Sequence, residues 1–236
     1  AAAVTGAFAD PTGYLPWAVA AGISGMLGLV CFYAALASGT MGVVSPVAAL
    51  GVVVPVMIGL ARGERPAVLQ LAGIAVAIGG VVLASGPELS GRAGVRPVVL
   101  ASLAAVGFGL AFVFIAEGSR SSALMTMVTM RVASVSLLAV TALVLARKAR
   151  EGWAAVSWRD GSLLVLTGLG DVAANLTYAI ATQAQQLSVI SVLGSLYPVV
   201  TVLLARVIHG ERLLPVQTAG VVAALSGVGM IAAGGA

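Results

Sequence analysis

Long uncharged stretches dominate the hydrophobic pattern of this chain. Between Pro11 and Ala61 there is no Asp, Glu, Lys or Arg, and the apolar positions run on continuously instead of alternating with polar ones. A helix needs about 20 apolar residues to cross the roughly 30 Å hydrocarbon core of a bilayer. This stretch is therefore long enough for two such helices, and Ser38-Gly39-Thr40 divides it.

The same pattern over the whole chain predicts eight transmembrane helices. The continuous apolar runs are about twice as long as the ten-residue alternating segments that are typical of a membrane β-barrel. We therefore expect an all-α integral membrane protein, a bundle of transmembrane helices. The predicted helices span 14–37, 41–61, 66–87, 97–116, 123–146, 161–182, 187–207 and 214–234.

The composition excludes most other classes. The chain is 60% hydrophobic and 8% charged, whereas soluble domains carry about 25% charged residues. The net charge of +4 comes from arginines scattered through short segments between helices, which favours an anionic membrane surface over nucleic acid as partner. The single cysteine, Cys31, excludes a disulfide framework and a cysteine-rich metal site. The sequence shows no catalytic set of side chains, so we expect neither an enzyme nor a cofactor.

Two segments of the chain are copies of each other. Residues 63–81 align without gaps with residues 210–228, and nine of the nineteen positions are identical. Biased composition does not explain the shared Gly-Glu-Arg turn or the Gln that follows five residues later, at Gln70 and Gln217. We interpret the two Gly-Glu-Arg turns as structural, with the Glu and Arg side chains capping or pairing at helix junctions.

The copies divide the chain into two repeats. Residues 1–86 form the first repeat, with three helices, and residues 97–236 form the second, with five. An odd number of helices in each copy inverts one relative to the other, which is typical of secondary transporters that bind substrate near the membrane midplane. In the second repeat, 64 residues (97–160) precede its third helix. In the first repeat, only 13 residues precede the helix that corresponds to it, 14–37. We therefore expect about 50 further residues with two more helices before Ala1, and a complete inverted-repeat bundle of ten helices.

Several motifs resemble a known family. Residues 170–181 (GDVAANLTYAIA) and 188–206 (SVISVLGSLYPVVTVLLAR), together with the paired Gly-Glu-Arg segments, are similar to the drug/metabolite transporter superfamily and to its EamA-type branch of ten-helix permeases. The resemblance covers essentially the whole chain, and it is strong in the last three helices and weak in 97–146. It implies a secondary permease, often an exporter of amino acids or other metabolites, that crosses the cell membrane several times. A bacterial inner membrane is the location that we expect.

Two ionisable residues lie deep inside predicted helices, where they are costly and often functional. Asp171 is about 15 Å into its helix and Arg131 is about 12 Å into the preceding, antiparallel one. We therefore expect the two side chains to approach each other. Two interpretations of these residues are open. They could recognise a charged substrate or couple a proton to transport. Alternatively, they could form a structural ion pair, or the arginine could extend its charged end toward the membrane surface.

Further polar residues share helix faces with each other. Asn175 and Tyr178 follow Asp171 at positions i+4 and i+7, and Ser191, Ser195 and Pro198 share a face of the next helix. The face of Asp171, Asn175 and Tyr178 could line a cavity or instead hydrogen-bond between helices. Each serine could line the cavity or instead bond a preceding carbonyl of its own helix. In the first repeat, Tyr33 occupies the helix that corresponds to the helix of Tyr178. The predicted substrate-binding residues are Asp171, Asn175, Tyr178, Ser191, Ser195, Tyr33 and Arg131.

These observations favour a secondary active transporter of small polar metabolites such as amino acids, working by alternating access between two inverted repeats. Its partners would be a small-molecule substrate and the lipid bilayer, and not nucleic acid. A non-transporting membrane scaffold subunit and a lipid-head-group translocase are the alternatives. The distribution of Lys and Arg puts residues 147–160 in the cytoplasm and the C-terminus outside, whereas the family resemblance implies that both termini are cytoplasmic.

Overall fold

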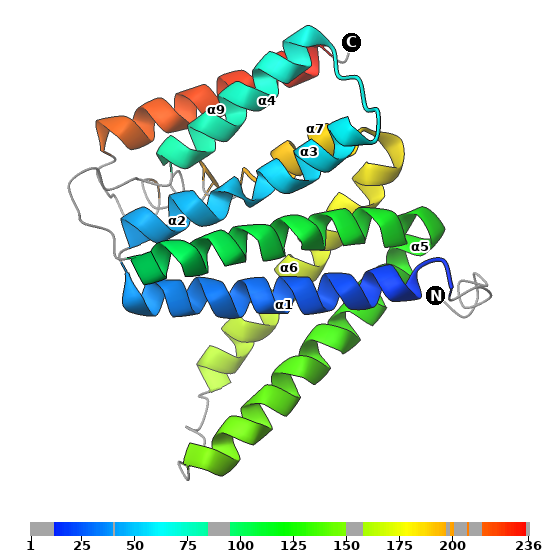
Figure 1. Ribbon diagram of the computed structural model, residues 1–236, viewed down its shortest axis with the longest axis vertical. Helices are drawn as coiled ribbons and strands as arrows, with labels where there is room; N and C mark the ends of the chain where they lie inside the picture. Colours follow the sequence, from blue (N-terminus) through cyan, green and yellow to red (C-terminus); the bar gives the residue numbers. More distant parts are fainter. Residues whose placement is uncertain are drawn as a thin grey trace. The chain divides into compact units, whose positions relative to one another are not determined.

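The computed structural model is helical nearly throughout the residues that it describes, which are 12–39, 41–84, 95–149, 158–196, 199–200, 207 and 214–234. No strand occurs within these ranges. The predicted all-α fold is therefore confirmed. The elements are α1 (Leu15–Ser38), α2 (Met41–Ala49), the 3₁₀ helix η1 (Leu50–Val52), α3 (Val53–Ala61), α4 (Val68–Ala84), α5 (Val95–Ala149), α6 (Trp158–Ala184), α7 (Leu187–Gly194) and α9 (Pro215–Gly234) (Figure 1).

Five helical segments are long and apolar enough to cross a membrane. The 17 residues of α4 fall just short of that test, but they correspond to about 25 Å of helix and are within the range seen for transmembrane helices. The predicted helix over 187–207 begins as α7, and most of its remainder lies outside the described residues. The five long apolar segments are Leu15–Ser38, Val43–Ala61, Val95–Leu143, Gly161–Ala184 and Pro215–Gly234.

Helix α5 combines two predicted helices, 97–116 and 123–146. Its 55 residues include one non-helical position, Ser122, with φ −162° and ψ 108°. The Met125 N–H donates to the Ser122 hydroxyl (3.3 Å), so Ser122 caps the segment that follows it. The 49-residue segment Val95–Leu143 would measure about 70 Å as one helix, more than twice the hydrocarbon core. They correspond to two membrane crossings joined at Ser122.

The predicted helix over 41–61 is interrupted by η1 at Leu50–Val52. Pro55 follows this segment, and a proline lacks the N–H that would bond the carbonyl of Gly51 four residues before it. The local tightening at η1 is explained by that missing bond. The Gly51 carbonyl lies so close to Gly109 of α5 that a Cβ at Gly109 would overlap it.

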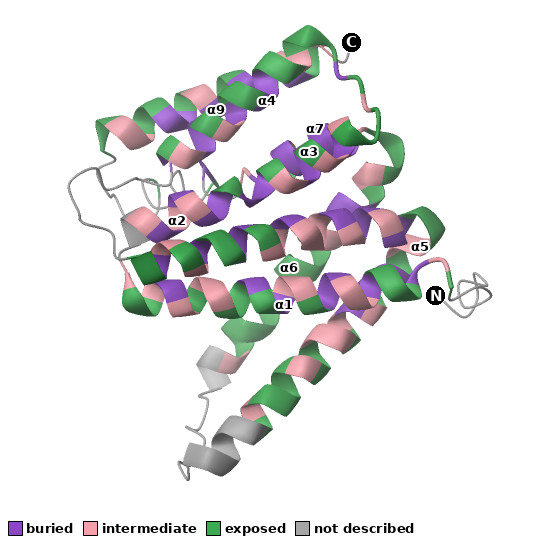
Figure 2. Cartoon of the chain, viewed as in Figure 1, coloured by how far each residue is buried: buried purple, intermediate pink, exposed green. Residues whose placement is uncertain are grey.

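The helices fall into two compact units. The first comprises Ala1–Met26 and Phe114–Ala184, and the second comprises Leu27–Val113 and Gln185–Ala236. In the first unit the rings of Trp17 and Phe114 pack with their centroids 6.0 Å apart. Four consecutive residues of α6, Leu163–Leu166, are all more than 60% exposed (Figure 2). Because four consecutive residues point to all sides of a helix, this apolar segment is suited to lipid and not to water.

In the second unit, α4 and α9 lie side by side along their lengths and run antiparallel (Figure 1). Their backbones approach so closely that a Cβ at any of four glycines would meet backbone atoms of the opposite helix within 3 Å. Small residues allow such an approach in membrane helices. The facing pairs, at spacings of four, three and four residues, are Gly73–Ile231, Ala77–Gly227, Gly80–Ala224 and Ala84–Gly220.

These facing pairs have two-fold symmetry. Residues of α9 follow their α4 counterparts by 147 positions, as Glu211 follows Glu64 (211 − 64). The counterparts of Gly73 and Ile231 are therefore Gly220 and Ala84, which also face each other. Two antiparallel helices that match in this way are related by an axis perpendicular to both. For membrane-spanning helices that axis lies in the membrane plane, which is the geometry of inverted repeats.

Two hydrophobic clusters of the second unit repeat this symmetry. Residues 45–56 match 188–199 at a spacing of 143 (199 − 56), shorter than the spacing for α4 and α9 because the second copy has extra residues before its Gly-Glu-Arg turn. With these two spacings, five members of one cluster correspond to five members of the other. The corresponding pairs are Val56/Val199, Ile74/Val221, Ala77/Ala224, Val192/Ala49 and Ile231/Ala84.

Gln70, its counterpart Gln217 and Glu64 of the first Gly-Glu-Arg turn have capping roles. Gln70 Oε1 accepts the Ala67 N–H (2.8 Å) and Gln217 Oε1 accepts the Leu214 N–H (3.0 Å), which is one half of a capping box at the start of α4 and of α9. Gly63 has φ +90°, a conformation that favours glycine. Glu64 caps the start of α7, so the structural role predicted for the first Gly-Glu-Arg turn is confirmed. The second turn lies outside the described residues.

Candidate functional site

Arg131 and Asp171 form an ion pair within the first unit, between the second half of α5 and the middle of α6. Arg131 Nη2 donates to Asp171 Oδ2. The side chains are 33% and 54% exposed, respectively. The approach predicted from their depths in adjacent helices is therefore confirmed, and both side chains remain partly exposed.

Asn175 extends this pair into a group of three side chains, Arg131, Asp171 and Asn175, which we call the Asp171 group. Asn175 Nδ2 donates to Asp171 Oδ1 (3.1 Å) and to the Asp171 backbone carbonyl (2.9 Å). Each carboxylate oxygen of Asp171 thus has one donor, and the i, i+4 spacing places Asn175 on the face of α6 that carries Asp171. The Asn175 amide thus bonds within its own helix, whereas we expected it to line a cavity or to bond another helix.

Arg131 retains an unused donor. Its Nε atom is buried and has no hydrogen-bond partner among the described residues. An unsatisfied buried donor costs about 1–3 kcal/mol, which is not expected of an ion pair kept only for stability. The Asp171 group therefore combines a cation, an anion and an amide whose hydrogen bonding is incomplete.

Tyr178 and Gln183 lie further along α6. Tyr178 is buried, at 6% exposure, on the face predicted for it. Gln183 lies just beyond the helix predicted over 161–182, but α6 extends to Ala184 and the Gln183 side chain donates to the Ser119 carbonyl of α5. The sequence gives no signal for this contact, because it depends on how the two helices meet.

The remaining predicted residues belong to the second unit. Tyr33 of α1 is 62% exposed, and Ser191 of α7 and Ser195 at its C-cap are buried, at 0% and 4%. The Ser195 hydroxyl donates to the Val192 carbonyl of its own helix (2.8 Å), which is the self-bonding alternative weighed for these serines. Pro198, predicted to share their face, lies outside the described residues. The structure thus gathers Arg131, Asp171 and Asn175 into one contact group and places Ser191 in α7 and Ser195 at its C-cap.

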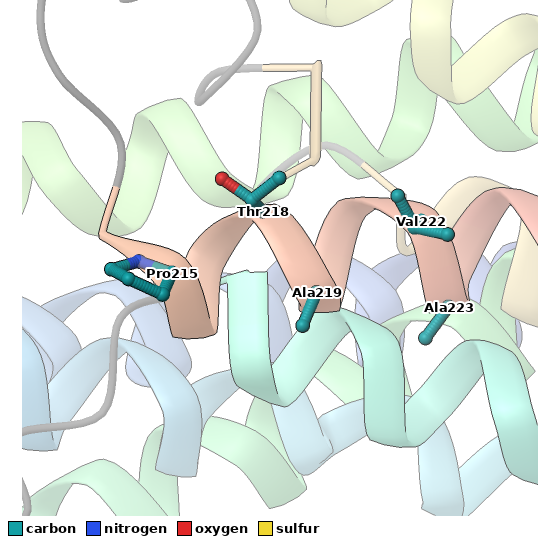
Figure 3. A pocket seen from close by; sticks show the side chains of 5 residues that line it. All are labelled: Pro215, Thr218, Ala219, Val222 and Ala223. Carbon is teal, nitrogen blue, oxygen red and sulfur yellow. The ribbon is translucent and has the colours of Figure 1, made fainter.

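A surface depression of about 680 Å³ follows one face of α9 (Figure 3). All five lining residues come from this single helix, and none is ionisable. It contains none of the predicted site residues. Among its lining side chains the polar group is the Thr218 hydroxyl, which donates to the Leu214 carbonyl (3.3 Å). The lining residues are Pro215, Thr218, Ala219, Val222 and Ala223. Within the described parts of the chain, no cluster of three metal-binding side chains occurs.

Comparison with known proteins addresses the family directly. A solved crystal structure of a protein superposes with a TM-score of 0.69 over 97% of this chain and 89% of its own length, at 18% sequence identity, and so has the same fold. No curated protein matches the sequence. The sequence profile of the EamA-like transporter family matches residues 95–233, more than half of the chain. With its apolar helices and its multi-pass membrane fold, this chain belongs to the EamA-like transporter family, within the drug/metabolite transporter superfamily.

Proposed function

We propose that this protein is a secondary active transporter that moves small polar metabolites, such as amino acids, by alternating access between its two inverted repeats. The family supports membrane transport in general. The Asp171 group supports the finer statement, because it places opposite charges and an amide in the middle of membrane-crossing helices.

The chemistry of the Asp171 group suits a small zwitterion. The Asp171 carboxylate could exchange its arginine partner for a substrate ammonium, and the Arg131 guanidinium could take the substrate carboxylate in a charge-assisted hydrogen bond. Such an exchange keeps every charge paired, so it avoids leaving an isolated charge in a medium of low dielectric constant. The substrate then replaces the protein's own ion pair.

The sequence has no nucleotide-binding loop. We therefore propose that an ion gradient or substrate exchange drives transport. The lipid partner is the cell membrane, which we take to be the inner membrane of a bacterium.

The test is counterflow uptake by the purified full-length protein in proteoliposomes, with a panel of labelled amino acids and other polar metabolites. We expect saturable uptake that Asp171→Ala reduces at least ten-fold. The matched control is Thr177→Ala on the same helix, where an exposed hydroxyl bonds only its own Ala173 carbonyl (2.8 Å) among the described contacts. This control should transport at the normal rate.

The outcomes separate the alternatives. Well-folded protein that takes up no compound of the panel contradicts transport and favours a scaffold subunit. Movement of a head-group-labelled lipid between leaflets, without metabolite uptake, favours the translocase. Uptake that Asp171→Ala leaves unchanged keeps the transporter and removes Asp171 from its site.

A further inference from the structure

The carboxylate of Glu64 bridges from the first Gly-Glu-Arg turn to the start of α7. The Leu187 N–H donates to Oε1 (2.7 Å) and the Ser188 N–H donates to Oε2 (3.0 Å). The carboxylate lies at the positive end of the helix dipole, and both hydrogen bonds are charge-assisted. Gln186, the residue at the N-cap position, contributes no side-chain cap. The start of α7 is therefore capped from a distant part of the chain.

This cap joins the two sequence repeats. Glu64 belongs to the first repeat, and α7 belongs to the second. Val56 of α3 and Val192 of α7 lie in one hydrophobic cluster, so an apolar contact accompanies the cap. Helix α7 carries Ser191, and Ser195 follows at its C-cap; both are predicted to bind substrate.

We propose that Glu64 is a positioning residue for transport: its carboxylate sets the position of α7 relative to the first repeat and thereby orients the serines of that helix. The inference rests on the proposed function, because Ser191 and Ser195 are site residues only if the protein transports a polar substrate.

Gly59 provides a way to move this carboxylate without changing it. A Cβ at Gly59 would overlap Glu64 Oε2, and the other two closest atoms also belong to the Glu64 carboxyl group. These atoms end a flexible side chain, so Gly59→Ala should displace the carboxylate and leave the helix backbones in place. Gly79→Ala is the matched control, because a Cβ at Gly79 would meet no described atom within 4 Å.

Ser188 provides a reporter of the same cap. Its side chain is fully buried, and its hydroxyl has no hydrogen-bond partner in the described part of the chain. Ser188→Cys therefore removes no hydrogen bond seen there, and the thiol becomes accessible only when the start of α7 moves. The native Cys31 is replaced by Ala in every variant, so that one thiol remains.

The experiment measures how fast a small maleimide alkylates the Ser188→Cys thiol in the full-length protein in proteoliposomes. We expect Glu64→Gln and Gly59→Ala to accelerate alkylation roughly five- to ten-fold, as the loss of a charged cap implies, and Gly79→Ala to leave it unchanged. In a Glu64→Ala background Gly59→Ala should add nothing, since no carboxylate remains to be displaced. Thermal unfolding of each variant controls for misfolding.

Counterflow kinetics then test the role in transport. For the labelled amino acid with the strongest uptake, we expect Glu64→Gln and Gly59→Ala to raise the half-saturating concentration at least three-fold, with a smaller effect on the rate at saturation. A cap that only stabilises the fold would lower the amount of active protein and leave half-saturation unchanged.

Three results overturn the proposal. The first is that neither Glu64→Gln nor Gly59→Ala accelerates alkylation, and the second is that Gly59→Ala still accelerates it in the Glu64→Ala background. The third is that alkylation becomes faster while the half-saturating concentration stays unchanged. Alkylation needs no substrate, so it remains informative if the wild-type protein transports nothing. If the wild-type protein transports nothing and alkylation still responds as expected, the proposed function is contradicted and the capping role of Glu64 is retained.

Discussion

At the residue scale, the ion pair between Arg131 and Asp171 controls how single substitutions act. Each side chain compensates the charge of the other inside a membrane-crossing helix. Removal of one partner leaves an uncompensated charge, and this is more destabilising than removal of both.

We therefore predict that Asp171→Ala destabilises the protein by about 1–3 kcal/mol and that Arg131→Ala in addition recovers part of the loss. The partial exposure of both side chains favours the lower end of this range. Thermal unfolding of the detergent-solubilised protein measures the effect. Arg120→Ala is the control, because its 70% exposed side chain pairs with Glu117 at 3.5 Å and should change stability by less than about 0.5 kcal/mol.

The sequence predicted the ion pair but not the contacts of Gln183 and Glu64. The number of residues from the helix ends indicated similar depths for Arg131 and Asp171. Their helices follow each other in the chain, which indicated that they are also neighbours in space. The Glu64 bonds to α7 join residues more than 120 positions apart. No spacing in the sequence encodes such a distance, so this contact required the tertiary structure.

At the scale of elements, Ser122 separates two helices that are otherwise continuous within α5. Its extended backbone and its hydroxyl, which accepts the Met125 N–H, make it the N-cap of the second helix.

We predict that Ser122→Ala destabilises the protein by about 1 kcal/mol and that Ser122→Gly has an effect of only a few tenths. Glycine at an N-cap retains the favourable backbone, whereas alanine provides neither the hydroxyl nor the flexibility. Unfolding in detergent, monitored by circular dichroism, distinguishes the two. Equal effects of both substitutions would contradict the capping role.

The contact between α4 and α9 gives a second prediction for an element. Gly80→Ala and Gly227→Ala place a methyl group against backbone atoms of the opposite helix, and each should destabilise the protein by about 1–3 kcal/mol. Because the two sites are symmetric images, the two losses should be similar.

The controls for that prediction are Gly79→Ala and Gly229→Ala, where a Cβ meets no described atom within 4 Å. These changes should be neutral or slightly stabilising, because alanine favours a helix. Thermal unfolding measures all four variants. A large loss at the control positions would show that the helix itself, and not its contact, is sensitive to alanine.

Apolar length predicted the helices well and their interruptions poorly. The ends of α1 and α9 lie within one residue of the predicted ranges. The 3₁₀ segment at Leu50–Val52 was missed because the residues around it remain apolar. The hydrophobic pattern is the same on both sides of the point at which the backbone hydrogen bonding changes. Only Pro55 was available as a local signal.

At the scale of the whole molecule, the paired symmetry of α4 and α9 supports two inverted copies. Equivalent residues of inverted repeats lie on opposite sides of a membrane. Arg65 and Arg212 are equivalent in the sequence repeat, with five predicted helices between them.

We predict that thiols introduced by Arg65→Cys and Arg212→Cys, each in a Cys31→Ala background, react with a membrane-impermeant maleimide from opposite sides. Intact cells compared with inverted vesicles provide the measurement. The side on which Arg65→Cys reacts also decides between the orientation given by the charge distribution and the one implied by the family. Reaction of both thiols from the same side contradicts the inversion.

The close backbone contact of α4 and α9 also has a consequence for how the sequence can evolve. Gly80 faces Ala224, and Gly227 faces Ala77, so the space beside each glycine is limited by backbone atoms of the other sequence repeat. A larger residue at either glycine can be accepted only if the two helices separate. Separation opens both symmetric positions together, so across related transporters positions 80 and 227 should either both stay small or both become larger. The two repeats would then remain coupled in their substitutions after their sequences had otherwise diverged.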